Sequence, residues 1–179
     1  MSNFVARDAH WNVRNGRARP SSLALTVPKL PQDFADLLAE LCEAEVEFLV
    51  VGGWAVVLYG HVRATDDLDI FVRASEKNSA RVVTALRAFG APLGAHGITN
   101  AHFSTEGDAY RFGIAPLKIE LLTKISGVSF DEALEGANSF DLDGDAIPYI
   151  GRRALIRNKR AAARYKDLAD IEELERIPE

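Results

Sequence analysis

Residues 50–72, VVGGWAVVLYGHVRATDDLDIFV, decide the fold of this chain. An apolar run turns at Gly52 and Gly53, passes through a short helical stretch, and returns as a second apolar run that carries Asp67 and Asp69. In a strand, residues two apart project from one face, so both aspartates lie on the same side. Two such carboxylates repel each other. A divalent cation such as Mg²⁺ removes that repulsion, because it prefers oxygen ligands and often binds substrate phosphates as well.

The glycine pair supplies the complementary half of a site. A strand that runs into Gly52-Gly53 and then into a helix brings backbone N–H groups to one point, where an anion can bind closely. A cation platform beside an anion cradle is the arrangement that phosphoryl-type transfer needs, since its catalysis is mostly positioning and charge stabilisation.

Glu120 is the candidate for a third carboxylate. It lies in the middle of a predicted strand over residues 117–123, where a charge between apolar neighbours is costly without a partner. If this strand lies beside residues 68–72, Glu120 reaches the face of Asp67 and Asp69. Each feature alone also fits a simple turn, a solvated strand edge or a surface residue, so the prediction rests on their combination.

The apolar periodicity predicts the elements around this segment. The mixture of periods 3.6 and 2 indicates an α/β chain, with Ser75 capping one helix and Gly90 ending it. The predicted helices cover residues 31–44, 53–59, 75–90, a short stretch from Phe130, and one or two helices over 152–174; the predicted strands cover 48–51, 68–72, 101–105, 109–114 and 117–123, with a hairpin over 142–148.

The composition limits the class of protein. The chain has 179 residues, of which 47% are hydrophobic, and a net charge of −5, so it can form one core and its whole surface is not that of a nucleic-acid-binding protein. Cys42 is the only cysteine, which excludes an intramolecular disulfide and a cysteine-based metal site. The longest apolar stretch, residues 48–59, is too short to span a membrane, and no secretory signal is recognisable, so we expect a cytoplasmic protein.

Residues 1–30 differ from the remainder. They show no sustained period and carry five basic residues against one acidic residue. We therefore predict a basic N-terminal extension over 1–30 and a single domain over 31–179. Such an arm can contact nucleic acid or an acidic partner, although a solvated tail is the more common case.

Three further residues are candidates for nucleotide binding. Arg63 can reach a triphosphate or neutralise Asp66, and Thr65 can bond to the Asp-Leu-Asp backbone or simply begin the strand. Lys159 is the cation of the C-terminal helical region that we expect to meet phosphates. The alternative is ion pairing along that helix surface among Lys166, Asp167, Asp170 and Glu173.

These motifs resemble a known superfamily. Gly52-Gly53-Trp54, followed thirteen residues on by Asp67-Leu68-Asp69-Ile70, is similar to the signature of the DNA polymerase β-type nucleotidyltransferases. Over residues 31–175 the chain looks like small bacterial nucleotidyltransferases related to abortive-infection and toxin–antitoxin enzymes, and its glycine motif is similar to that of antibiotic nucleotidyltransferases. The resemblance implies an α/β (α+β) nucleotidyltransferase fold: a mixed β-sheet flanked by helices, with a C-terminal helical segment.

The resemblance also implies a reaction. Such enzymes move a nucleoside monophosphate, here expected to be AMP from ATP, to an acceptor hydroxyl by a two-metal mechanism with Mg²⁺ or Mn²⁺. Carried over, the catalytic and metal-binding residues are Asp67, Asp69 and Glu120. The nucleotide-binding residues are Gly52, Gly53, Trp54, Arg63, Thr65 and Lys159. Two departures stand out, since many members have Ser or Thr where Trp54 stands and Asp where Glu120 stands.

Several alternatives remain open at the level of the sequence. The acceptor is RNA, a protein or a small molecule, and a partner protein such as an antitoxin is compatible with the resemblance. An aminoglycoside or lincosamide nucleotidyltransferase is one alternative function, and a catalytically inactive nucleotide-binding module of the same fold is another. A glycosyltransferase Asp-x-Asp motif does not explain the glycine pair, and the residues that flank Asp67 do not match a haloacid-dehalogenase phosphatase.

Overall fold

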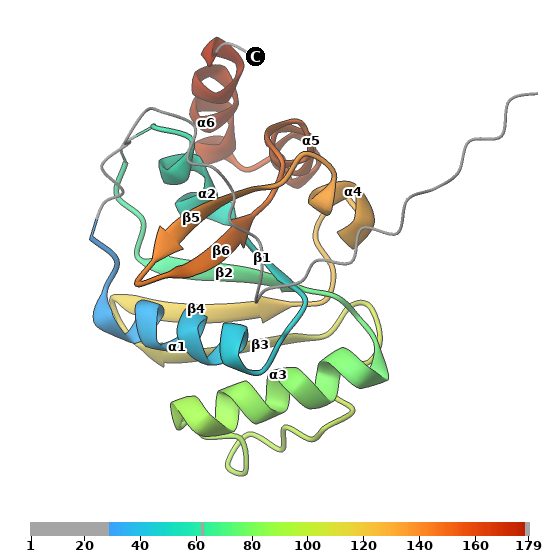
Figure 1. Ribbon diagram of the computed structural model, residues 1–179. Coiled ribbons are helices and arrows are strands. Elements are labelled where there is room, and N and C mark those ends of the chain that lie inside the picture. The colour runs from blue at the N-terminus through green and yellow to red at the C-terminus, as the bar shows by residue number, and fades with distance from the viewer. Residues whose placement is uncertain (1–28, 62, 178–179) are drawn as a thin grey trace, which may run out of the picture.

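The structure is a computed structural model that describes residues 29–61 and 63–177 (Figure 1). The predicted N-terminal extension falls almost entirely outside these residues. Six strands form one mixed sheet with the order β3-β4-β2-β1-β6-β5. The strands are β1 (Phe48–Val51), β2 (Asp67–Val72), β3 (Ala109–Ile114), β4 (Leu117–Leu122), β5 (Asn138–Leu142) and β6 (Asp145–Tyr149).

The pairing of the strands makes the sheet mixed. β1 is antiparallel to β2 and parallel to β6, whereas β2 is parallel to β4. Two antiparallel hairpins, β3–β4 and β5–β6, complete the two ends of the sheet. The second hairpin turns at Asp143 and Gly144, which both have positive φ, as a tight two-residue hairpin loop requires.

Helices cover the two faces of the sheet. On one face α1 (Gln32–Glu43) and α3 (Glu76–Phe89) pack together over a large apolar core. On the other face α4 (Phe130–Leu134), α5 (Arg152–Ala162) and α6 (Tyr165–Arg176) enclose a smaller core. The short helix α2 (Gly52–Leu58) contributes side chains to both cores, and Figure 1 shows it beside α6, away from α1 and α3.

Alternation along β2 separates the core from the site. Leu68 and Ile70 are fully buried in the core under α1 and α3. Asp67 and Asp69 therefore project from the opposite face, where α5 and α6 pack, and Asp69 is only partly exposed. Apolar side chains in place of Asp67 and Asp69 would be equally compatible with the sheet, so the two carboxylates require an explanation other than folding.

Most predicted elements are confirmed, and the mixed fold is the one expected. The helix expected over 53–59 begins one residue earlier, at Gly52, and the C-terminal region forms two helices, α5 and α6. The strand predicted over residues 101–105 is wrong. This stretch forms turns, in which Ser104 N donates to Ala101 O and the ring of Phe103 is fully buried. The buried Phe103 between polar neighbours gives this stretch the alternating pattern that is typical of a strand.

Among the described residues, no helix combines the length and the apolar character that crossing a bilayer would need.

Candidate active site

A row of charged residues crosses three neighbouring strands, and it contains two of the three predicted carboxylates. Asp69 of β2 is the register partner of Glu120 in the parallel neighbour β4. Glu120 is in turn the register partner of Arg111 in the antiparallel strand β3. Because register partners point to the same face of a sheet, Asp69, Glu120 and Arg111 share the face that also carries Asp67. The structure thus brings the three predicted carboxylates to one face, as a shared site requires.

The glycine pair is packed against this row. Gly52 has φ +63°, and a Cβ built at Gly52 would lie 1.9 Å from Asp69 Oδ2. A Cβ at Gly53 would lie 2.4 Å from Thr65 Oγ1 and 2.9 Å from Arg63 Nη2. Only glycine can therefore occupy either position without displacing a predicted site residue. The glycines allow the Asp69 carboxylate to rest against the beginning of α2, a role that sequence reasoning had assigned only to phosphate approach.

Electrostatic strain accumulates at Asp69. Burial, followed by the neighbouring charges of Glu120 and Asp67, raises the pKa of Asp69 from 3.8 to about 6. Lys166 and Arg164 oppose this rise from the C-terminal helices. The carboxylates are thus held together in a place where a further positive charge would relieve their repulsion.

Glu120 already has a partner. Arg111 Nη2 donates to Glu120 Oε2 at 2.7 Å. Within residues 29–61 and 63–177, no group of three or more His, Cys, Asp or Glu side chains is arranged to hold a metal ion as it stands. The donor atoms nevertheless suit a hard cation, because all three side chains offer carboxylate oxygens on one face and Gly52 leaves room for Asp69. A cation that binds Glu120 would compete with Arg111 for this carboxylate.

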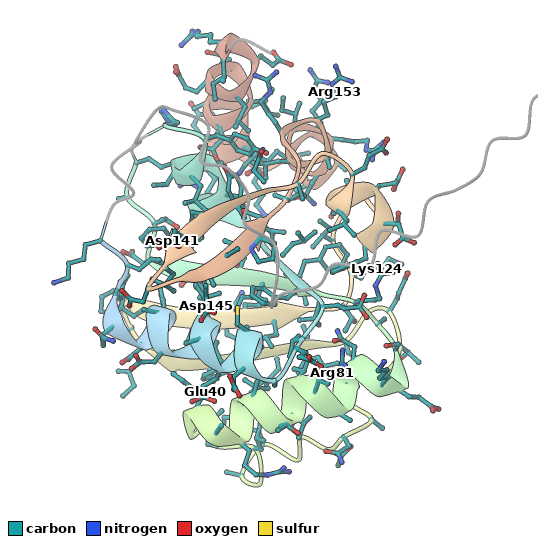
Figure 2. All side chains as sticks on the ribbon, in the orientation of Figure 1. Glu40, Arg81, Lys124, Asp141, Asp145 and Arg153 are labelled. Carbon is teal, nitrogen blue, oxygen red and sulfur yellow. The ribbon has the colours of Figure 1, made fainter. Side chains whose placement is uncertain are left out.

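A pocket of about 430 Å³ opens over this row, a volume ordinary for a small-molecule site. Its lining includes backbone of Gly52 and Gly53 as well as the carboxylates of β2 and β4. Basic side chains form much of the remaining wall. They are Arg63, Arg111, Lys124, Lys159, Arg164 and Lys166. Lys124, labelled in Figure 2, lies two residues after the end of β4, so both the sheet and the C-terminal helices bring cations to the pocket.

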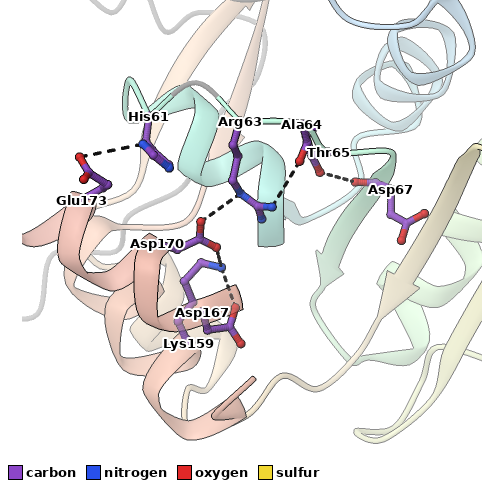
Figure 3. Close-up of polar contacts among 9 residues, drawn as sticks. All are labelled: His61, Arg63, Ala64, Thr65, Asp67, Lys159, Asp167, Asp170 and Glu173. Atoms are coloured by element: carbon purple, nitrogen blue, oxygen red, sulfur yellow. Dashed lines mark hydrogen bonds and ion pairs between the residues drawn. The ribbon is translucent and has the colours of Figure 1, made fainter. Parts of the chain in front are cut away.

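Lys159 is not placed as the nucleotide ligand that the sequence suggested. Its side chain is buried, and Nζ donates to Asp167 Oδ1 at 3.0 Å and to Asp170 Oδ2 at 2.7 Å. Asp170 also faces Arg63, whose Nε lies 3.0 Å from Asp170 Oδ1 (Figure 3). Together the buried Lys159, Asp167 and Asp170 and the partly exposed Arg63 tie α5 and α6 to the segment before β2. Lys159 touches the pocket wall, but two carboxylates already share its charge.

Trp54, which the sequence suggested as a nucleotide-binding residue, is not among the residues that line the pocket. The Trp54 side chain is 6% exposed, and its ring meets that of Phe34 edge-on with centroids 6.2 Å apart. It belongs to the core under α1 rather than to the pocket lining. Trp54 therefore fixes α2 on the sheet, because its side chain points into the core.

Thr65 and Arg63 lie where the sequence placed them, at the entrance to β2. Thr65 Oγ1 is 3.5 Å from the carbonyl oxygen of Asp67, a long contact. The Arg63 guanidinium donates to the carbonyl oxygen of Ala64 and pairs with Asp170. Both side chains line the pocket, so either can still contact a bound nucleotide.

The sequence did not single out Arg111 or Lys124, and it favoured Lys159 over Arg164 and Lys166, but all of these residues line the pocket. Arg111 had a detectable signal, because it stands at an alternate position of the predicted strand 109–114. Arg164 and Lys166 precede and begin α6, and both line the pocket. Neither makes an ion pair within the described part of the chain, in contrast to Lys159. Their placement depends on the turn at Ala163, which has positive φ and which no local pattern predicted.

A family model described as "Nucleotidyl transferase of unknown function (DUF2204)" matches residues 31–179. The chain belongs to this family. The fold, the carboxylates on the strands and the family match all support its nucleotidyltransferase character. Comparison with the curated proteins gives no significant match.

Two solved structures are similar to this family member. The lincosamide antibiotic adenylyltransferase LnuA, solved with lincomycin, shares 15% sequence identity with a TM-score of 0.53, covering 83% of this chain and 98% of the other. An antigenic nucleotidyltransferase-like protein from Paracoccidioides brasiliensis shares 15% identity with a TM-score of 0.48, covering 78% and 72%. At this identity the likeness to LnuA shows the fold alone.

Proposed function

We propose that the protein transfers a nucleoside monophosphate from a nucleoside triphosphate to an acceptor hydroxyl, with ATP as the expected donor. The observation that carries this proposal is the register of β2 and β4, which sets Asp69 beside Glu120 under the glycine turn. Two carboxylate strands that meet at an anion-binding turn suit a metal-bound triphosphate better than any other ligand chemistry.

Asp67, Asp69 and Glu120 would hold the divalent cations. When bound, Mg²⁺ or Mn²⁺ would supply charge stabilisation for the transferred phosphoryl group and a template for the two oxygens in line with it. The basic residues of the pocket would act on the nucleotide through their own side chains. Arg164 and Lys166 face the carboxylates from the opposite wall, where they would bind the β- and γ-phosphates.

The chemistry balances without a further reactant. The acceptor hydroxyl oxygen forms a bond to the α-phosphorus, and the bond from the α-phosphorus to the pyrophosphate oxygen breaks. A carboxylate of the site would accept the hydroxyl proton. Pyrophosphate leaves toward the cationic wall formed by Arg164 and Lys166.

The donor and the acceptor class can be found in one experiment. The full chain is incubated with Mg²⁺, each α-labelled triphosphate and a cell extract, which is then separated into RNA, protein and small molecules. Label in one fraction identifies the acceptor class and, by comparison of the four triphosphates, the donor. Purified lincomycin and an aminoglycoside serve as separate acceptors, because an antibiotic nucleotidyltransferase is the alternative function.

Matched variants decide whether transfer depends on this site. Asp67→Asn/Asp69→Asn keeps the side-chain size and removes both charges, whereas Glu172→Gln/Glu175→Gln removes two exposed charges from α6. Loss of label with the first variant and retention with the second supports the proposal. Equal labelling with the first variant would contradict it. No label in any fraction, together with no Mg²⁺-dependent ATP binding, would leave an inactive module of the same fold.

A further inference from the structure

Arg111 forms an ion pair with Glu120, which is one of the three carboxylates of the proposed metal site. Its guanidinium bonds to Glu120 Oε2 at 2.7 Å, and its own side chain is 57% exposed whereas that of Glu120 is 21% exposed. The two partners thus differ in exposure, because Glu120 is mostly enclosed at the surface of the sheet whereas most of the Arg111 side chain contacts solvent. If the pair opens, Arg111 is the member that has space to leave.

The position of Arg111 in the sheet gives the same direction. It lies on β3, the strand at the end of the sheet order, and the row from Asp69 through Glu120 ends at Arg111. An outward swing of Arg111 therefore crosses no further strand. An inward swing brings it to the pocket, which it already lines. A guanidinium bonded to Glu120 opposes the approach of a second cation to the same carboxylate, so Arg111 and a cation beside Asp69 compete for Glu120.

The charge balance of the row explains why such a contact exists. Asp67, Asp69 and Glu120 place three carboxylates on one face, and Arg111 is the cation that is bonded directly to one of them. The influence of Arg111 reaches the other two, since Asp67 and Asp69 both add to the rise in the pKa of Arg111 that Glu120 chiefly causes. A built-in counterion lowers the cost of keeping the row together.

We propose that Arg111 is a positioning residue that competes with divalent cations for Glu120 and releases it when the metal-bound nucleotide enters the pocket. The inference rests on the proposed function, because it assigns Glu120 to the metal. Arg111 acts through Glu120 and is not itself a ligand of the ion. It sets the affinity of the site, so that the complete carboxylate set forms only at the cost of one ion pair.

The test measures Mn²⁺ binding to the full chain by titration calorimetry and thermal unfolding with EDTA or with Mn²⁺. Arg111→Gln removes the competing cation, and Arg111→Lys keeps the charge. Arg81→Gln is the matched control, because Arg81 pairs with Glu45 at 3.1 Å on α3, across the sheet from the pocket (Figure 2). Glu120→Gln removes the contested carboxylate.

We expect Arg111→Gln to bind Mn²⁺ about fivefold more tightly than the wild type, which is the scale of one exposed ion pair. The variant should also unfold at a lower temperature in EDTA and gain more from Mn²⁺. Arg111→Lys and Arg81→Gln should bind Mn²⁺ with wild-type affinity, and Glu120→Gln should bind it more weakly.

Two other results would overturn the inference in distinguishable ways. Unchanged or weaker Mn²⁺ binding by Arg111→Gln, with normal binding by the wild type, would show that Arg111 does not compete, and the proposed function would survive. Absence of Mn²⁺ binding by the wild type, or equal binding by Asp67→Asn/Asp69→Asn, would remove the metal site and the proposed function with it.

Discussion

Gly52 and Asp69 lie so close together that no side chain can be added between them. A Cβ on Gly52 would stand 1.9 Å from Asp69 Oδ2, and the backbone of Gly52 has φ +63°. The first glycine of the turn and the second aspartate of β2 are therefore one structural unit. The spacing of the motif along the sequence reflects this contact, since α2 and the segment after it must return β2 to the same point.

Replacement of Gly52 by alanine tests this contact. We expect Gly52→Ala to lower the free energy of unfolding by about 2 kcal/mol, because alanine is strained at positive φ and displaces the Asp69 carboxylate. Nucleotidyl transfer should fall far more than the fraction folded. Urea unfolding and the labelling assay measure the two effects. Gly94→Ala, where an added Cβ meets nothing within 4 Å, is the control, and equal behaviour of the two variants would contradict the contact.

The raised pKa of Asp69 gives the site a defined pH dependence. Because the folded pKa of about 6 lies above 3.8, the folded state retains a proton that the unfolded state has lost. The free energy of unfolding contributed by Asp69 therefore falls as the pH rises from about 4 to about 6. Asp69→Asn should remove this fall and stabilise the protein near pH 7 by about 3 kcal/mol while abolishing transfer.

Urea unfolding of wild type and Asp69→Asn from pH 4 to pH 8 measures this difference. Mn²⁺ affinity of the wild type should rise over the same interval, since the cation needs the ionised carboxylate. Asp108→Asn is the control, because it changes a carboxylate just before the beginning of β3. Parallel stability curves for the wild type and Asp69→Asn would show that Asp69 carries no strain.

The sequence was sufficient for the elements that have a strong local signal. Ser75 and Gly90 delimit α3 as cap and C-terminal glycine, and the alternation along β2 put Asp67 and Asp69 on one face. Glu120 was placed in a strand correctly, whereas its adjacency to β2 was only a condition of the prediction, and the pairing of β2 with β4 meets it. These predictions succeeded because periodicity and capping act over a few residues.

Tertiary contacts explain the rest. Lys159 was chosen from its place on a basic helix, but its partners Asp167 and Asp170 belong to the next helix, and the turn between them has no local signature. Trp54 followed the glycines in sequence, yet the direction of its side chain depends on how α2 packs against α1. Arg111 became part of the site through cross-strand register, which only pairing of β3 with β4 defines.

The buried position of Lys159 predicts a structural role. Lys159→Met leaves Asp167 buried without its cation and Asp170 with Arg63 alone, so we expect a loss of about 3 kcal/mol in the free energy of unfolding. Arg160 lies on α5 as Lys159 does, and Arg160→Met, which breaks an exposed pair with Glu175 of α6, should cost at most about 1 kcal/mol. A stable Lys159→Met variant with weakened ATP binding would instead restore Lys159 as a phosphate ligand.

Trp54→Phe tests the corrected position of the aromatic residue. The Trp54 side chain lies in the core, and its indole nitrogen has no hydrogen-bond partner among the described residues, so phenylalanine removes packing but no hydrogen bond. We expect a loss of about 1–2 kcal/mol in the free energy of unfolding and unchanged ATP affinity. Fluorescence-detected nucleotide binding at a temperature where both proteins are folded makes the comparison. Weaker ATP binding by the variant would place Trp54 in the site after all.

Arg164 and Lys166 should distinguish a triphosphate from a monophosphate. Both side chains line the pocket opposite Asp69, so their charges can bind the β- and γ-phosphates that AMP lacks. We expect Arg164→Gln/Lys166→Gln to raise the Kd for Mg²⁺-ATP about tenfold or more while changing the Kd for AMP little. Arg87→Gln/Lys77→Gln removes the same two charges from α3 and should change neither value. Equal weakening of ATP and AMP binding by the first variant would mean that these cations contact the nucleoside or only support α6.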